Sequence, residues 1–118
     1  KSYFNISQNK LSEIYNLSDL LFFASTKEGF GLPILEAQSC GVPVITSKTT
    51  SMPYVAGNGA IIVNPYSIDE IKNTINKIIT DFDHREDLIQ KGFVNIKRFE
   101  MKSFIKNFED LYNKLKSK

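Results

Sequence analysis

Lys27-Glu-Gly-Phe-Gly-Leu-Pro-Ile-Leu-Glu-Ala37 is the stretch that decides the fold, because it carries the chain from a buried strand into a helix. Residues 20–24, just before it, are apolar throughout, which is typical of a strand buried on both faces in a parallel sheet. Gly29 and Gly31 permit backbone conformations that a Cβ atom would forbid. Pro33 suits the first position of a helix, where its missing N–H has no partner in any case. The stretch therefore predicts a strand, a glycine turn and a helix.

The glycine turn also predicts a binding site. The backbone amides of residues 30–32 point out of a helix N-terminus, which is a ready site for phosphate. Two carboxylates bracket the turn, Glu28 before it and Glu36 one turn into the helix. A carboxylate accepts hydrogen bonds and can take two donors at once, as the vicinal hydroxyls of a ribose require. This pattern predicts a nucleotide-sugar ligand with six donor-binding residues: Glu28, Gly29, Phe30, Gly31, Leu32 and Glu36.

Several of these residues also have an ordinary structural interpretation. Two nearby glycines often mark a turn and nothing more. Taken alone, Glu36 is more often a first-turn acid that the helix dipole favours. The hydroxyl groups of residues 46–51 could contact the donor or could form turns. Cys40 is expected to be a small buried side chain at a helix end, and His84 an exposed loop residue. One His and one Cys support no catalytic triad and no metal cluster.

The remaining chain alternates between strand and helix patterns. We expect strands at residues 3–6, 20–25, 42–46 and 60–63. We expect helices at 7–19, from the glycine turn to 39, for one turn near Met52, and from Ser67, Asp83 and Met101 onward. This order predicts an α/β fold with a Rossmann-like parallel sheet flanked by helices. Ligands of such sheets bind beyond the carboxyl ends of the strands, where the glycine turn and the loop of residues 47–59 both lie.

Apolar spacing predicts which helix faces are buried. In the first helix Leu11, Ile14, Tyr15 and either Leu17 or Ser18 point inward. After the capping box at Ser67 the inward residues are Ile68, Ile71, Ile75, Ile78 and Ile79. The last helix carries a long apolar stripe: Met101, Phe104, Ile105, Phe108, Leu111, Tyr112 and Leu115. The small sheet already has other helices to cover it, so we expect this stripe to mediate self-association of the chain.

Composition limits the function classes. The 118 residues suffice for one domain, and a formal net charge of +2 is too small to indicate a nucleic-acid partner. One cysteine allows no internal disulfide and fits a reducing compartment, so we expect a cytoplasmic protein. No apolar run approaches the ~20 residues of a membrane span. The chain starts at Lys1 without a signal peptide or an initiator methionine, from which we expect a fragment.

Glu28-Gly-Phe-Gly-Leu-Pro-Ile-Leu-Glu36 resembles the Glu-x7-Glu signature of the glycosyl transferases group 1, the retaining enzymes of the glycogen-synthase and sucrose-synthase type. The similarity continues in Cys40-Gly-Val-Pro-Val-Ile45, upstream in residues 11–19 and downstream in Asn64-Pro65. It implies that residues 1–118 form a single, partial nucleotide-sugar-binding domain. That domain would belong to the C-terminal half of a two-domain, B-type glycosyltransferase fold.

The resemblance also implies roles. The counterpart of Glu36 binds the ribose of the donor, and that of Glu28 contacts hydroxyls of the transferred sugar, which makes Glu28 the candidate catalytic residue. Neither acts as an acid or base, and no metal or other cofactor is needed beside the nucleoside-diphosphate sugar. Tyr54 departs from the family, which usually has glutamate there. Phe4 stands where glycine is usual, so the base cannot be inferred.

The implied enzyme is a metal-independent hexosyltransferase that acts with retention on a glycan or lipid-linked acceptor in polysaccharide biosynthesis. Its N-terminal acceptor domain and the basic pair that neutralises the diphosphate are missing, so we expect the chain alone to be inactive. We expect the full-length enzyme to associate peripherally with the inner face of the membrane. Two alternatives stay open: a non-catalytic nucleotide-sugar-binding module, and a Rossmann-like dehydrogenase fragment. A dinucleotide fingerprint would require a third glycine at Ile34 and an acid after the next strand, and both are absent.

Overall fold

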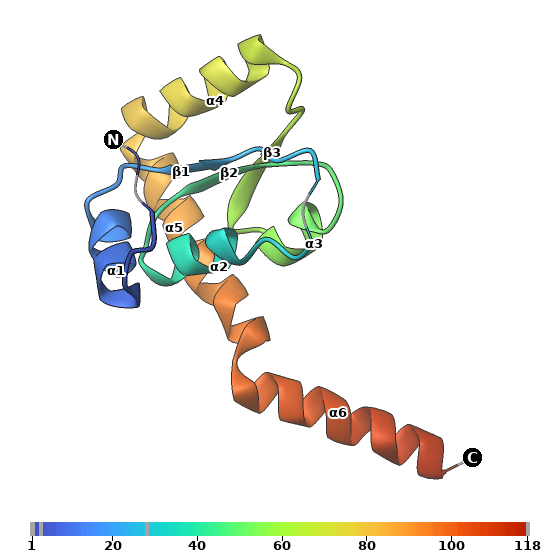
Figure 1. Ribbon diagram of the computed structural model, residues 1–118. Helices are drawn as coiled ribbons and strands as arrows, with labels where there is room; N and C mark the ends of the chain where they lie inside the picture. The colour runs from blue at the N-terminus through green and yellow to red at the C-terminus, as the bar shows by residue number, and fades with distance from the viewer. Residues whose placement is uncertain (1, 3, 28, 118) are drawn as a thin grey trace.

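Figure 1 shows the computed structural model of the chain, which describes the backbone of residues 2, 4–27 and 29–117. The side chains of these residues are described except at 101–104 and 106–108. Within these limits the sheet has three parallel strands in the order β1-β2-β3, namely β1 (Leu21–Phe23), β2 (Val44–Ser47) and β3 (Ala60–Val63). In the register of the sheet, Val44 lies between Leu21 and Ala60.

Helices lie on both sides of this sheet. In Figure 1, α4 covers one side, while α1, α2 and α3 lie on the other, and α5 runs from α4 past the sheet to α2. Their bounds are α1 Gln8–Asn16, α2 Leu32–Ser39, α3 Met52–Ala56, α4 Ile68–Thr80 and α5 Phe82–Ile96. A 3₁₀ helix, η1 (Lys97–Phe99), follows, and the chain ends with α6 (Met101–Lys116).

The strand alternation divides the core into two clusters. Successive side chains of a strand point to opposite faces. Val44 accordingly packs with Ile34 and Val55 on the side of α2 and α3. Its neighbour Ile45 packs with Ile78 on the side of α4. Each side chain of β2 is buried, so this central strand has no solvent-exposed face. The sheet therefore depends on helices on both sides, as the apolar strands predict.

The predicted fold class is confirmed, and so are the strands at 20–25, 42–46 and 60–63 and the helical turn near Met52, with small shifts of their ends. The predicted strand at 3–6 is wrong for residues 4–6, and Tyr3 lies outside the described residues. Pro33 occupies the second helical position, because α2 begins at Leu32. Gly41 follows α2 with a φ of +70°, as a helix-ending glycine should.

Other predictions at helix ends are also wrong. The cap of α5 is Asp81, whose side chain accepts from the His84 amide, so Asp83 lies within the first turn. Ile68 and Ile79 are exposed although they match the apolar spacing, and of the two alternatives in the first helix it is Ser18, not Leu17, that is partly buried. Ile78 is fully buried, and Ile71 and Ile75 pack against the same cluster, as predicted. The apolar spacing of α4 thus predicts burial correctly at Ile71, Ile75 and Ile78 and wrongly at Ile68 and Ile79.

Helix α6 stands apart from the rest of the molecule. In Figure 1 it extends away from the sheet and from the helices that cover it. Four members of its apolar stripe are exposed, namely Ile105, Leu111, Tyr112 and Leu115, while Met101, Phe104 and Phe108 are not among the described side chains. Of the helices in the described part of the chain, none is long and apolar enough to cross a membrane.

Candidate functional site

The turn between β1 and α2 requires glycine at position 31. Gly31 caps α2 with φ +96° and ψ 41°, the left-handed region that side chains disfavour, and no side chain caps the helix. A Cβ atom here would lie 3.1 Å from Sδ and 3.2 Å from Cε of Met52, which is fully buried in α3. The first turn of α2 therefore packs tightly against Met52, and no side chain of the described residues forms a hydrogen-bonded cap at its N-terminal end.

The backbone amides at this turn belong to two exposed residues, Phe30 and Leu32, and to the buried Gly31 between them. The Gly31 carbonyl accepts from the Ile34 amide at 3.0 Å, which closes the first turn. Among the described residues, the amides of Phe30, Gly31 and Leu32 donate no hydrogen bond. Such amides carry the positive end of the helix dipole. The end of α2 can thus bind an anionic group through its backbone.

Hydroxyl groups from the end of β2 and from the loop after it hold the turn in place. Ser51 Oγ lies 3.2 Å from the Gly29 carbonyl oxygen and 3.0 Å from that of Phe30, and donates to both. Three further hydroxyls donate to carbonyls at the end of β1: Thr46 to Phe23 at 2.7 Å, Ser47 to Ser25, and Thr49 to Ser25 at 2.8 Å. Because these donors are used within the chain, the structure favours the turn-forming interpretation of the loop.

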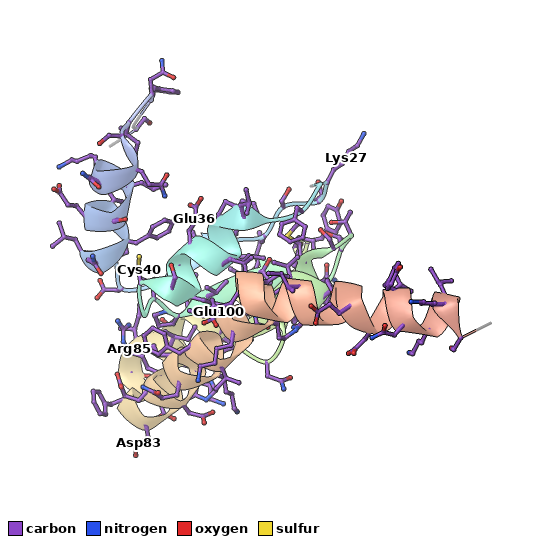
Figure 2. The ribbon with its side chains drawn as sticks, turned by 90° about the horizontal axis from the view of Figure 1, so that it is seen from below. Lys27, Glu36, Cys40, Asp83, Arg85 and Glu100 are labelled. Carbon is purple, nitrogen blue, oxygen red and sulfur yellow. The ribbon has the colours of Figure 1, made fainter. Side chains whose placement is uncertain are left out.

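Glu36 is fixed by a tyrosine from another helix. Tyr15 of α1 donates its phenol hydrogen to Glu36 Oε2 at 2.9 Å. Burial, the hydrogen bond to Glu36 and the charges of Glu36 and Cys40 raise the pKa of Tyr15 well above its usual value. The phenol therefore stays protonated and remains a donor. Glu36 itself is half-buried, and Figure 2 shows it on α2, beside α1.

An aromatic cluster connects the turn to η1. The Phe30 ring meets Phe99 edge-on with centroids 6.0 Å apart, and Tyr54 meets the same ring at 6.4 Å. The Arg98 guanidinium lies over the rings of Tyr54 and Phe99, at 5.0 and 5.2 Å. Tyr54 thus has a packing role in this chain. Sequence reasoning missed the cluster, because the contact spans more than forty residues and no spacing rule connects them.

A buried amide network lies beneath the site. Gln38 of α2 donates to the Ala56 carbonyl at 3.0 Å, and its own carbonyl accepts from Asn95 of α5 at 2.8 Å. Asn95 donates also to the Val55 carbonyl and accepts from Arg98. Sequence reasoning missed both amides, although a signal was present. Gln38 lies four residues after Ile34, and Asn95 seven after Leu88, both core spacings.

The structure brings most predicted site residues together. Gly29, Phe30, Gly31 and Leu32 form the turn at the N-terminal end of α2, and Glu36 lies one turn into the same helix. Lys27, which precedes them, points away from the body in Figure 2. The sixth predicted residue, Glu28, lies outside the described residues.

His84 differs from expectation, whereas Cys40 lies at the end of α2 against the core, as expected. His84 lies in the first turn of α5, and its Nε2 atom is buried without a hydrogen-bond partner in the described structure. Cys40 is partly buried against the core cluster of α2 and remains a free thiol. Among the described residues, no three His, Cys, Asp or Glu side chains come together as a metal site would require.

Comparison with known sequences identifies relatives. The sequence profile of the family glycosyl transferases group 1 matches residues 1–94. O-antigen chain mannosyltransferase B of Escherichia coli is 37% identical over 94 residues, which make up 80% of this chain and 25% of that protein. D-inositol 3-phosphate glycosyltransferase of Corynebacterium jeikeium is 26% identical over 108 residues, or 90% of this chain and 26% of that protein. The chain thus spans about a quarter of the length of these relatives.

Solved structures share the fold. The C-terminal domain of a glycosyl transferase group 1 family protein from Francisella tularensis is 28% identical, with a TM-score of 0.74 over 85% of this chain and 53% of that one. Sucrose-phosphate synthase from Thermosynechococcus elongatus has a TM-score of 0.76 over 95% of this chain and 29% of that one, at 24% identity. Anabaena HepE, solved with UDP and glucose, has a TM-score of 0.72 over 86% of this chain and 28% of that one, also at 24% identity.

Proposed function

This chain belongs to the family of glycosyl transferases group 1, and from that premise we propose that it is the donor-binding part of a retaining glycosyltransferase. Residues 1–118 would form a single, partial domain that binds a nucleoside-diphosphate sugar. The observation that carries this proposal is the N-terminal end of α2, where the amides of residues 30–32 donate no hydrogen bond within the described part of the chain and Glu36, one turn into the helix, has one carboxylate oxygen fixed by Tyr15. Together they offer donors to a diphosphate and an acceptor to a ribose.

The proposed chemistry is electrostatic. The amides of residues 30–32 would stabilise the diphosphate as negative charge develops on it. Glu36 would bind the ribose, and Glu28 would hold hydroxyls of the transferred sugar at the reacting centre without acting as an acid or base. The acceptor hydroxyl would bond to the anomeric carbon on the face that the diphosphate leaves, and the departing diphosphate oxygen would take the hydroxyl proton. No metal is needed for these roles, because backbone amides and the basic side chains of the remaining domain would carry the compensating charge.

The substrates are proposed from the relatives. One relative is named as a mannosyltransferase of O-antigen chains, and a solved neighbour of the same fold holds UDP and glucose. We propose a nucleoside-diphosphate hexose as the donor and a growing glycan or a lipid-linked saccharide as the acceptor. Catalysis would require the N-terminal acceptor domain, so the isolated chain would bind donor weakly and transfer nothing. The full-length enzyme would work at the inner face of a membrane.

The affinity of the chain for UDP, GDP and ADP, each with and without its sugar, tests this proposal. Binding of at least one should be detectable by calorimetry. Glu36→Ala should then weaken it by about 1.5–3 kcal/mol, the range for a hydrogen bond to a charged group. Glu109→Ala, which removes an exposed carboxylate from α6, serves as the matched control and should bind normally. Equal loss in both variants, or binding of nicotinamide dinucleotides alone, would contradict the proposal.

A further inference from the structure

The hydroxyl group of Tyr15 makes a hydrogen bond that the packing of its ring does not require. It is 8% exposed and packs with the buried residues Ile34 and Ala37 in the core cluster of α2. Its ring could serve there as a phenylalanine would. The phenol oxygen instead reaches Glu36 Oε2 at 2.9 Å, across twenty-one positions of sequence. The hydrogen bond connects a core residue to the acid at the proposed donor site.

This hydrogen bond restricts the Glu36 side chain before any ligand binds. A glutamate has three rotatable bonds, and ordering a long side chain costs up to ~2 kcal/mol of entropy. The donor from α1 fixes Oε2, and Oε1 keeps its capacity to accept from another group. A hydrogen bond to an ionised partner is also stronger than one between neutral groups. The carboxylate is therefore held in one place with one oxygen available.

We propose that Tyr15 is a positioning residue, which holds Glu36 so that its other carboxylate oxygen accepts from a ribose hydroxyl of the donor nucleotide. This inference rests on the proposed function. Tyr15 itself does not touch the nucleotide. The raised pKa of its phenol keeps the hydrogen in place over the working pH range. If Tyr15 were a core residue only, its hydroxyl would affect stability and leave the ribose contact unchanged.

A double-mutant cycle separates these two roles. The probe is whichever of UDP, GDP and ADP binds the unaltered chain most tightly. Tyr15→Phe keeps the ring and removes the hydroxyl, and it should weaken binding roughly three- to tenfold, as expected for one hydrogen bond. Tyr112→Phe removes a hydroxyl from an exposed tyrosine of α6 and should leave the affinity for the nucleotide unchanged. In a Glu36→Ala background, Tyr15→Phe should have no further effect, because the group it positions is gone.

A second comparison tests whether the loss of affinity in Tyr15→Phe depends on the ribose hydroxyls of the nucleotide. With the 2′,3′-dideoxy form of the same nucleotide, Tyr15→Phe should bind as well as the unaltered chain. If Tyr15→Phe weakens both forms equally, or adds to the effect of Glu36→Ala, Tyr15 acts through general packing and the inference is overturned. Normal ribonucleotide binding by Tyr15→Phe, with binding reduced by Glu36→Ala, would overturn the inference and leave the proposed function standing.

The unaltered chain supplies a readout that does not depend on the variant's folding. The ring resonances of Tyr15 should shift when the ribonucleotide binds and stay in place with the dideoxy form. If the ring resonances of Tyr15 never move while the side-chain resonances of Glu36 do, the inference is overturned. If none of the three nucleotides binds the unaltered chain, the proposed function fails and this inference fails with it.

Discussion

The outer and inner faces of α2 differ in how completely their polar groups are paired. At the N-terminal turn, the amides of residues 30–32 have no acceptor among the described residues. On the outer face of the helix, Glu36 is half-buried and accepts one hydrogen bond, from Tyr15. Two residues further on, Gln38 is 1% exposed, and both ends of its amide group are hydrogen-bonded. Buried polar groups cost free energy unless they are paired, whereas a binding site needs unpaired ones. The glycine turn and the eight-residue helix that follows it thus carry both the proposed binding groups and the amide group that holds the helix in place.

Removing Asn95 tests the inner face and should have the largest effect on stability. Asn95→Ala deprives the buried Gln38 and Val55 carbonyls of their donor, and it leaves Arg98 with the Tyr54 carbonyl as its acceptor. Since each unpaired buried group costs about 1–3 kcal/mol, we expect a loss of roughly 2–4 kcal/mol in the free energy of unfolding. Urea denaturation measures this loss. Asn73→Ala on the exposed side of α4 is the control, and equal losses in the two variants would mean that the network adds nothing.

Gly31→Ala alters the turn itself and should affect both stability and binding. An alanine must adopt the left-handed conformation and also displace the tip of Met52, which lies 3.1 Å from the new Cβ atom. We expect a stability loss of about 1–2 kcal/mol from the backbone conformation. Nucleotide binding should weaken as well, because the amides of the turn would move. Thermal unfolding and calorimetry report the two effects, and normal binding by a destabilised Gly31→Ala would show that the amides do not bind the donor.

The apolar stripe of α6 is a second unpaired surface, and we propose that it mediates self-association. Ile105, Leu111, Tyr112 and Leu115 are all exposed on a helix that extends from the body. Sedimentation should show concentration-dependent association that Leu111→Lys reduces. Asn113→Lys adds the same charge to the same helix off the stripe and should leave association unchanged. A monomer at all concentrations would refute the proposal.

The smallest expected effect is that of a chelator on donor binding. Since backbone amides would bind the diphosphate, EDTA should leave the affinity for the nucleotide unchanged, and it should leave turnover by the full-length enzyme unchanged as well. Calorimetry with and without EDTA checks the first expectation. Loss of binding or activity that magnesium or manganese restores would show that a metal, and not the end of α2, compensates the charge.

The sequence predicted the elements of the fold better than their ends and side-chain contacts. The buried strands, the glycine turn and the middle of α4 follow from local rules, and the structure confirms them. Ile68 and Ile79 match the helical period and yet are exposed, because periodicity does not say where the core ends. The α5 cap fell on Asp81 instead of Asp83, since both acids can cap and only the end of α4 decides between them.

The sequence predicted which residues form the candidate site, but it did not predict most of the contacts that hold them in place. Gly29 to Leu32 and Glu36 are neighbours in sequence, so their proximity follows from one turn and one helix. The partners that hold them come from distant elements: Tyr15 from α1, Ser51 from the loop before α3, and Phe99 from η1. Such contacts depend on how helices pack on the sheet, which a single sequence does not determine.

Mapping of nucleotide binding by chemical-shift perturbation tests the central claim most directly. The amide resonances of this chain would be followed during titration with UDP, GDP and ADP sugars. If the unpaired end of α2 is the donor site, the largest shifts should fall on residues 29–32 and on Glu36, with small shifts at Gln38 and Asn95. Shifts confined to a face distant from residues 29–36, or no shifts with any of the three, would contradict the account.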